Sequence, residues 1–147
     1  PRVIARRLLV SASEDVGNAD PAALPLAVAA AQVVELAGSP ECDWALAQAV
    51  TYLASAPKSP RAGEALAAAR EQIATGGQLP VPGHLRASAK TYQSPHAVGE
   101  PFDLAQEYLP QEIATKRFYA PSGSGAEAEL RDRIAALRAA RAKGSKA

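Results

Sequence analysis

The sequence lacks methionine, has one cysteine and two histidines among its 147 residues, and contains only 5% aromatic residues. With Cys42 alone, no disulfide can form within the chain. No uncharged apolar run is long enough to cross a bilayer, and the arginine-containing start does not resemble a signal peptide. We therefore expect a cytoplasmic protein that does not insert into a membrane.

Motifs for catalysis are also missing. The sequence contains no glycine-rich phosphate loop of P-loop spacing and no GxGxxG, HExxH or GxSxG motif. The soft metal ligands Cys42, His84 and His96 are far apart, whereas a structural zinc site usually draws its four ligands from closely spaced pairs. We therefore expect no catalytic residue, no cofactor site and no metal site in this chain.

The charges nearly balance, with 16 basic and 15 acidic residues and a formal net charge of +1. The chain as a whole therefore gives no argument for a nucleic-acid partner. Four basic side chains in or beside predicted turns could still contact DNA phosphates: Lys58, Arg61, Arg86 and Lys90. The simpler alternative, which we favour, is that they are ordinary solvated side chains.

What the chain does contain is alanine, within a hydrophobic content of 48%. Alanine is the best helix former, and the β-branched and aromatic residues that favour strands are comparatively few. The composition predicts an all-α fold, either one domain or a compact domain with an appendage.

The first helix is expected from about Pro1 to Ser13, because Ile4, Leu8 and Ala12 recur on one helical face. No initiator methionine or capping residue precedes this pattern, so we expect the chain to be part of a longer protein.

Glu14 and Asp15 follow at the end of this helix, where the helix dipole disfavours anions. We expect them to pair with Arg6 or Arg7, or to cap the turn. A catalytic or metal role is the weaker alternative, because adjacent helical positions point in different directions.

Residues 21–38 are predicted to form the central helix, around which the rest of the chain packs. Gln32 and Glu35 are its only polar side chains, so we expect it to be covered on most sides. Pro25 is expected to kink the helix, unless the helix begins nearer Leu24.

Two further helices are predicted over about 39–56 and 60–75, separated by short proline-containing turns. The apolar face of the first of these is expected to contain Leu46, Val50 and Leu53. We expect Trp44 to close one end of the core rather than to stack on a ligand.

The helical pattern ends at LPVPGHLR, whose two prolines predict an extended segment before residue 84. A short helix is expected over 84–90, and one or two helical turns over 102–108. Gly123 and Gly125 then predict a hinge. We therefore expect a helical domain over 1–121, followed by a hinge and an amphipathic helix within 122–147.

The last helix, expected over 126–142, carries a narrow apolar stripe of Leu130, Ile134 and Leu137. Glu127 and Arg131 are spaced as an i, i+4 ion pair. Because the stripe is too thin for a buried helix, we expect an edge helix or a surface that binds a partner.

Several long stretches together resemble one family. These are ARRLLVSASEDVGNADP, LPLAVAAAQVVELAGSPE, LAQAVTYLASAPKS and LPVPGHLR, in order and in register, followed by QEYLP and KRFYAP. They resemble the C-terminal region of the replication-associated recombination protein A family, also called RarA or MgsA, which is related to the Werner helicase-interacting protein. The likeness departs near Pro95, where the loop looks shortened and Ala97 stands in place of the usual acidic residue.

The resemblance implies a AAA+ ATPase related to clamp-loader subunits. ATP and Mg²⁺ would be bound by an N-terminal module that this chain lacks, so no enzyme activity is expected here. The C-terminal region would be an all-α domain, like a clamp-loader collar, that holds a homotetramer together. The parent protein would act in replication restart, repair and recombination at nucleoid-associated replication forks, and would contact DNA and single-stranded DNA-binding protein.

Two alternatives stay open at this point. The domain could be chiefly a DNA-binding module, or it could dock a protein partner through the apolar stripe of the last helix.

Overall fold

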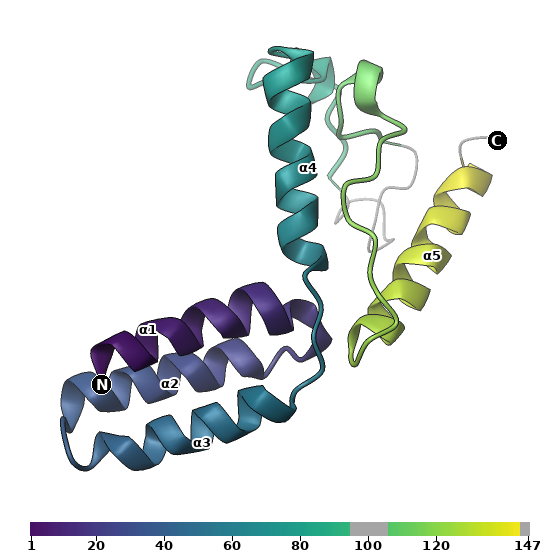
Figure 1. Ribbon diagram of the computed structural model, residues 1–147. Helices are drawn as coiled ribbons and strands as arrows, with labels where there is room; N and C mark the ends of the chain where they lie inside the picture. The colour runs from purple at the N-terminus through teal and green to yellow at the C-terminus, as the bar shows by residue number, and fades with distance from the viewer. Residues whose placement is uncertain (95–105, 145–147) are drawn as a thin grey trace. The chain divides into compact units, whose positions relative to one another are not determined.

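The computed structural model describes residues 1–94 and 106–144, and every regular element in these ranges is a helix (Figure 1). The α-helices are α1 (Arg2–Ser11), α2 (Ala23–Leu36), α3 (Cys42–Ser55), α4 (Arg61–Gly76) and α5 (Glu127–Gly144). A π-helical turn (Ala12–Val16) and 3-10 turns (Gly17–Ala19, Gly83–Leu85 and Gln111–Ile113) complete the set. The predicted all-α fold class is confirmed.

The chain forms two compact units. The first contains Pro1–Ala67 and Tyr119–Arg131, and the second contains Ala68–Phe118 and Asp132–Ala147. Helices α4 and α5 each contribute residues to both units. The predicted boundary at residue 121 stays a prediction.

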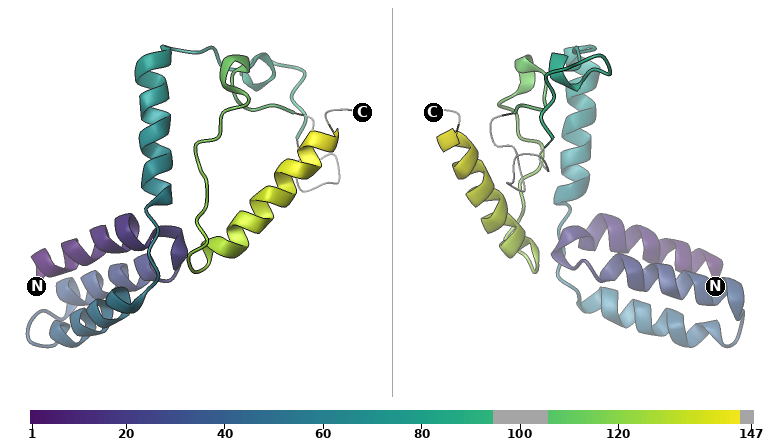
Figure 2. Two further views of the ribbon diagram at one scale, coloured as in Figure 1. Left: turned by 45° about the vertical axis from the view of Figure 1, so that its right-hand side comes forward. Right: turned by 180° about the vertical axis from the view of Figure 1, so that it is seen from behind.

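In the first unit, α1, α2 and α3 lie side by side as a bundle joined by short turns (Figures 1 and 2). Small residues dominate its buried core, which comprises Ala5, Ala12, Val16, Ala19, Ala23, Ala27, Ala30, Val34, Cys42, Leu46, Ala49 and Leu53. Small side chains at helix contacts let the backbones approach closely, and interhelical distances depend on those side chains.

Helix α2 buries a single stripe of Ala23, Ala27, Ala30 and Val34, which recur at the spacing of one helical face. The expectation that α2 is covered on most sides is wrong for this chain, because larger side chains on its other faces reach solvent. The helix begins at Ala23, so Pro25 lies in the first turn, where a backbone N–H has no partner to lose. The alternative start near Leu24 is thus close to the structure, and no kink is required.

Helix α3 likewise turns its small and medium side chains inward. Ala49 is buried, whereas Val50, expected on the apolar face with Leu46 and Leu53, is exposed. The prediction that Trp44 closes the core is wrong, because 82% of its surface is exposed. The core end is filled by Cys42, two residues earlier and fully buried.

The segment that follows α3 is tied to the turn that follows α1. The Ser59 N–H donates to the Asp15 carbonyl oxygen at 2.8 Å. Gly17 has φ of 52°, and a Cβ there would come within 2.7 Å of the Ser59 carbonyl oxygen. Only glycine fits this position, because both the backbone conformation and the contact exclude a side chain.

Gly125, expected in a hinge, makes a similar close approach. Its φ is 52°, and a Cβ would collide with the Ala19 carbonyl oxygen and the Pro57 ring. The next N–H, that of Ala126, donates to the Ala19 carbonyl oxygen at 2.8 Å. These backbone contacts attach Gly125 and Ala126 to the bundle, and the predicted hinge stays a prediction.

Outside its shares of α4 and α5, the second unit is largely irregular over the described residues. The extended segment predicted before residue 84 is present, but the helix expected over 84–90 is wrong, because only the 3-10 turn Gly83–Leu85 forms. Of the turns expected over 102–108, residues 102–105 lie outside the described residues and 106–108 are not helical. Pro80 and Pro82 favour an extended conformation for the residues before them, which accounts for the extended segment before residue 84.

Across the residues that the structure describes, no helix combines the length and the apolar character that crossing a bilayer requires.

We predict that Ala27→Leu destabilises the domain by about 1–3 kcal/mol, because Ala27 is fully buried between helices and extra methylenes would force them apart. The free energy of unfolding would be measured by urea denaturation at one fixed protein concentration. Ala29→Leu is the matched control on the exposed side of the same helix, with an expected change within about 0.5 kcal/mol. Equal decreases in the free energy of unfolding of the two variants would contradict the close packing of α2 at Ala27.

Candidate interaction surfaces

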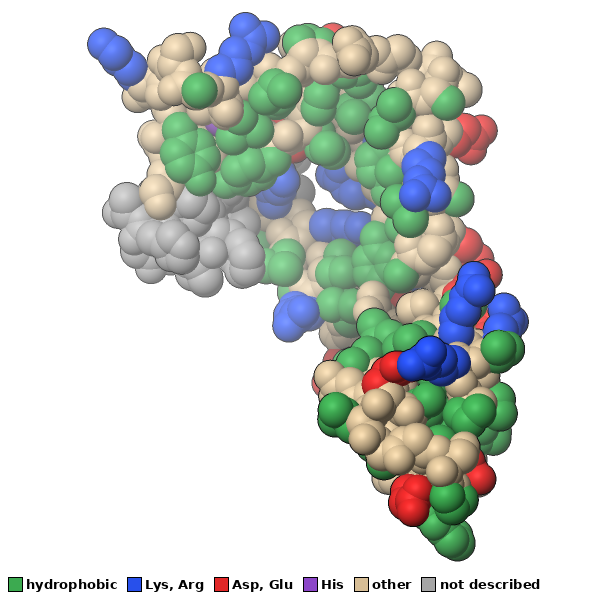
Figure 3. Space-filling model, turned by 90° about the vertical axis from the view of Figure 1, so that its left-hand side faces the viewer, with side chains coloured by type: hydrophobic (Ala, Val, Ile, Leu, Met, Phe, Trp, Pro, Cys, Tyr) green, Lys and Arg blue, Asp and Glu red, His purple; other side chains and the backbone are tan. Residues whose placement is uncertain are grey.

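Large apolar side chains lie on the outside of the first unit. Val3, Leu36 and Trp44 expose 76%, 88% and 82% of their surface, respectively. Others are less exposed but still open to solvent: Ile4, Leu24, Val28, Val50 and Tyr52. On the face of each unit that Figure 3 presents, apolar side chains reach the surface among charged ones. These exposed side chains make the first unit a candidate interaction surface.

A groove of about 520 Å³ runs along the first unit between α1 and α2. Its apolar lining consists of Leu9, Val28, Ala31 and Leu36, and its polar lining residues are Gln32 and Glu35. The Arg2 guanidinium makes a bidentate contact with the Glu35 carboxylate, at 2.8 and 2.7 Å. This ion pair is exposed, so it orients the two helices more than it stabilises them.

A buried carboxylate joins distant parts of the first unit. Glu127, the first residue of α5, is fully buried, and its Oε2 accepts hydrogen bonds from the Ser59 and Ser122 hydroxyls at 2.6 and 2.5 Å. The Ser122 N–H donates to the same oxygen at 2.7 Å, and the Tyr119 hydroxyl donates to Oε1 at 2.6 Å. Asn18 in turn donates to the Tyr119 hydroxyl at 3.0 Å. We call Ser59, Tyr119, Ser122 and Glu127 the Glu127 cluster.

The cluster keeps Glu127 charged. Burial alone raises the pKa of a carboxyl group, but the hydrogen bonds from Ser122, Ser59 and Tyr119 outweigh it and lower the pKa of Glu127 to about 2. The same cluster raises the pKa of Tyr119, first through burial and then through its bond to Glu127. All these donors bind the one buried carboxylate of Glu127, so the cluster holds Ser59, Tyr119 and Ser122 against the start of α5.

The four basic residues considered for DNA contact do not form one site. Lys58 donates to the Leu53 and Ala56 carbonyl oxygens at the end of α3, which is a capping role. Arg61 pairs with Glu64 at 2.8 Å on α4. Arg86 lies in the second unit and donates to the Val81 carbonyl oxygen at 3.1 Å.

Lys90, the fourth, is an exposed side chain of the second unit. Lys58 and Arg61 therefore serve local contacts in the first unit, while Arg86 and Lys90 belong to the second.

The apolar stripe of α5 is present but weak. Leu130 and Ile134 are half-buried, and Leu137 is exposed. Because α5 begins at Glu127, these residues follow the Glu127 cluster directly in the sequence.

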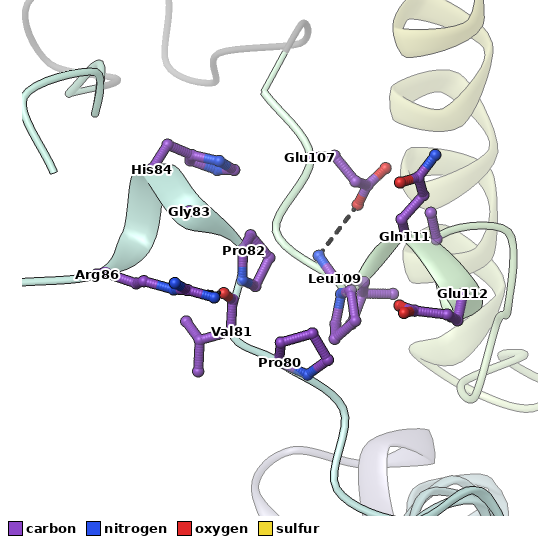
Figure 4. A pocket seen from close by; sticks show the side chains of 12 residues that line it. Pro80, Val81, Pro82, Gly83, His84, Arg86, Glu107, Leu109, Gln111 and Glu112 are labelled. Atoms are coloured by element: carbon purple, nitrogen blue, oxygen red, sulfur yellow. Dashed lines mark hydrogen bonds between the residues drawn. The ribbon is translucent and has the colours of Figure 1, made fainter.

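The second unit contains a pocket of about 400 Å³ (Figure 4). Prolines and backbone supply much of its lining, which comprises Pro80, Val81, Pro82, Gly83, His84, Arg86, Glu107, Leu109, Pro110, Gln111, Glu112 and Ala114. The Glu107 carboxylate accepts from the Leu109 N–H at 3.3 Å, drawn in Figure 4, and pairs with Arg141 at 2.7 Å. His84 Nε2 is buried and has no hydrogen-bond partner among the described residues. The charged groups of this pocket mostly hold the fold of the unit.

A model of one protein family, described as the MgsA AAA+ ATPase C terminal, matches residues 1–138. The chain belongs to this family. The resemblance seen in the sequence is thereby confirmed.

Similar proteins support the assignment of the chain to the MgsA C-terminal family. The chain is 44% identical to an uncharacterised AAA domain-containing protein of Mycobacterium tuberculosis, over 95% of the chain and 33% of that protein. It is 37% identical to the replication-associated recombination protein A of Escherichia coli K12, over 93% of the chain and 33% of that protein. It is 40% identical to the ATPase WRNIP1 of Dictyostelium discoideum, over 81% of the chain and 15% of that protein.

The chain therefore spans about a third of the length of the first two relatives. It corresponds to the C-terminal domain of replication-associated recombination AAA+ ATPases, and the ATPase site lies elsewhere in those proteins.

The Glu127 cluster is the feature that the sequence did not predict. The i, i+4 spacing of Glu127 and Arg131 indicated an exposed ion pair, yet the carboxylate is buried. A signal was available in the neighbouring residues, since Tyr119 and Ser122 supply hydroxyl groups just before a helix start that favours an anion.

We predict that Glu127→Gln lowers the free energy of unfolding by about 2 kcal/mol or more near neutral pH, because a Gln amide cannot accept from all the donors of the cluster. The depressed pKa stabilises the fold above the ordinary carboxyl pKa of 4.5, and this stabilisation is lost as the pH falls towards about 2. Urea denaturation between pH 7 and pH 3 would measure both effects.

The matched control is Glu129→Gln, an exposed carboxylate two residues along α5, with an expected change within about 0.5 kcal/mol. The difference in stability between wild type and Glu127→Gln should shrink as the pH falls. A difference that stays constant down to pH 3 would show that the charge of Glu127 contributes nothing.

Proposed function

We propose that this chain is the oligomerisation domain of a replication-fork-associated AAA+ ATPase and that it assembles as a homotetramer. The observation that carries the proposal is the inverted distribution of apolar side chains in the first unit. Its core is built mainly of alanine, whereas Val3, Leu36 and Trp44 are left largely exposed. A single copy thus buries mostly alanine, with a few valine and leucine side chains, and leaves many of its large apolar side chains for another surface.

The free-energy argument follows from buried area. Burying apolar surface stabilises an assembly by about 25 cal/mol per Å², and a large side chain offers far more surface than an alanine. Helix α4 adds Leu66 and Ile73, both exposed, to the apolar residues available for contact. Interfaces of stable homo-oligomers are more apolar than the rest of a protein surface, which is consistent with this distribution.

The names of the relatives support a parent protein that acts in DNA replication and recombination. In that protein, ATP and Mg²⁺ would bind outside the region represented by this chain. DNA, single-stranded DNA-binding protein and a nucleoid location would likewise belong to the assembled parent at replication forks. A tetrameric C-terminal domain would hold its ATPase modules at a fixed number and spacing.

The alternative of a DNA-binding module has less support. Lys58 and Arg61 already make contacts within the first unit, so they would have to exchange these for phosphate oxygens. A salt titration separates the two functions, because phosphate contacts weaken steeply with salt and apolar interfaces do not.

We predict that the full chain at tens of micromolar has the mass of a tetramer without nucleotide or DNA. The mass should persist in 1 M NaCl, because apolar burial dominates the interface. Light scattering behind a sizing column gives the mass directly. A monomer under these conditions would sink the proposal.

Leu137→Asp in the same chain tests the stripe of α5. Leu137 is exposed, so the substitution should leave the fold intact, and we expect the mass to stay that of the tetramer. Loss of the tetramer in this variant would move the interface to Leu130, Ile134 and Leu137.

A further inference from the structure

Trp44 is the only tryptophan of the chain and lies in the first turn of α3, with 82% of its surface exposed. A tryptophan that contributes nothing to its own core leaves a large apolar surface in water. Buried tryptophans are among the residues that contribute most to protein interfaces, because they offer much rigid apolar area. Trp44 is therefore the strongest anchor that the first unit presents.

The groove between α1 and α2 offers a matching receptor. Leu9, Val28 and Leu36 supply apolar lining to this shallow, open groove of about 520 Å³. Trp44 does not line this groove in its own chain. The groove is thus open to a side chain from another molecule.

Basic and acidic residues occupy different stretches of the sequence of the first unit. Residues 1–7 carry Arg2, Arg6 and Arg7 and no carboxylate. Residues 8–57 carry no lysine or arginine but contain six carboxylates, and Glu41 and Asp43 lie directly before Trp44 and are exposed. The surface around the anchor is therefore acidic, and the start of α1 is basic.

Arg6 extends the basic side towards the groove. It lies four residues after Arg2, which pairs with Glu35 of the groove rim, and three residues before Leu9 of the groove lining. Glu41 and Asp43 beside the anchor are opposite in charge to Arg6 beside the groove, while Glu35 of the groove is already paired with Arg2, so the contact is complementary in charge.

We propose that Trp44 of one copy inserts into the α1–α2 groove of a second copy, with Glu41 and Asp43 facing Arg6 of that second copy. The inference rests on the proposed self-association and assigns its contact. The start of α1, the end of α2 and the start of α3 meet at one end of the bundle (Figure 1), as the Arg2 to Glu35 pair also requires. Two copies can therefore exchange Trp44 reciprocally about a twofold axis, so each pair of copies makes the contact twice.

The test compares four variants of the full chain by light scattering across a dilution series: Trp44→Ala, Arg6→Glu, Asp43→Arg, and Arg6→Glu with Asp43→Arg. Trp44→Ala should weaken association at least tenfold, because it removes the anchor from both halves of a reciprocal contact. Each single charge reversal should weaken it several-fold, and the double reversal should recover most of that loss. Tryptophan emission of the unsubstituted chain should shift to longer wavelength on dilution as Trp44 returns to water.

Ile73→Ala is the matched control, since it truncates another exposed apolar side chain, on α4. Circular dichroism and melting at a dilution where every variant is monomeric would check that the folds are equal. Trp44, Arg6 and Asp43 are exposed, so little change is expected there.

The outcomes separate the two proposals. If the unsubstituted chain does not associate at all, the proposed function itself is wrong. If it associates and Trp44→Ala associates equally well, the function stands and the Trp44 contact is wrong. If Ile73→Ala alone weakens association, the interface lies on α4, and a double charge reversal that fails to recover association would exclude the contact between Asp43 and Arg6.

Discussion

The close approach of α1, α2 and α3 is the constraint on which the rest of the first unit depends. Alanines dominate their buried contacts (Ala5, Ala12, Ala23, Ala27, Ala30 and Ala49), and the larger buried side chains are few: Val16, Val34, Leu46 and Leu53. Many of the other large apolar side chains, such as Val3, Leu36 and Trp44, lie outside this core. A chain that is nearly half hydrophobic thereby acquires an apolar surface as a direct result of its narrow core.

The sequence predicted the fold class and most helix bounds well, because these depend on local signals. Helix α4 was expected over 60–75 and spans Arg61–Gly76, between a proline and two glycines that any helix would find hard to cross. The regular spacing of apolar residues likewise placed α1 and α5. Proline-rich stretches were harder, since they exclude long elements without specifying the short turns that replace them.

The faces of the helices were predicted less well, and α2 shows why. Nearly every side chain of α2 is apolar, so its periodicity defines no preferred face. Reading alanine and leucine as equally apolar suggested burial on most sides. The structure distinguishes them by volume, because only the alanines and Val34 fit the seams. Trp44 was also misplaced, since its hydrophobicity suggested a core position, whereas 82% of its surface is exposed.

The sequence signal for the Glu127 cluster covered only its nearby members Tyr119 and Ser122. The contact with Ser59 was not predictable, because Ser59 lies 68 residues before Glu127. One consequence concerns the chain between its anchored ends. It leaves the bundle after Ser59 and returns at Tyr119, and both residues bind the same carboxylate. The cluster therefore closes a long loop without a covalent bond. The entropy cost of closing such a loop grows by only about 0.6 kcal/mol for each doubling of its length. A change of a few residues in the length of the segment between Ser59 and Tyr119 would consequently alter the entropy cost of closing this loop very little.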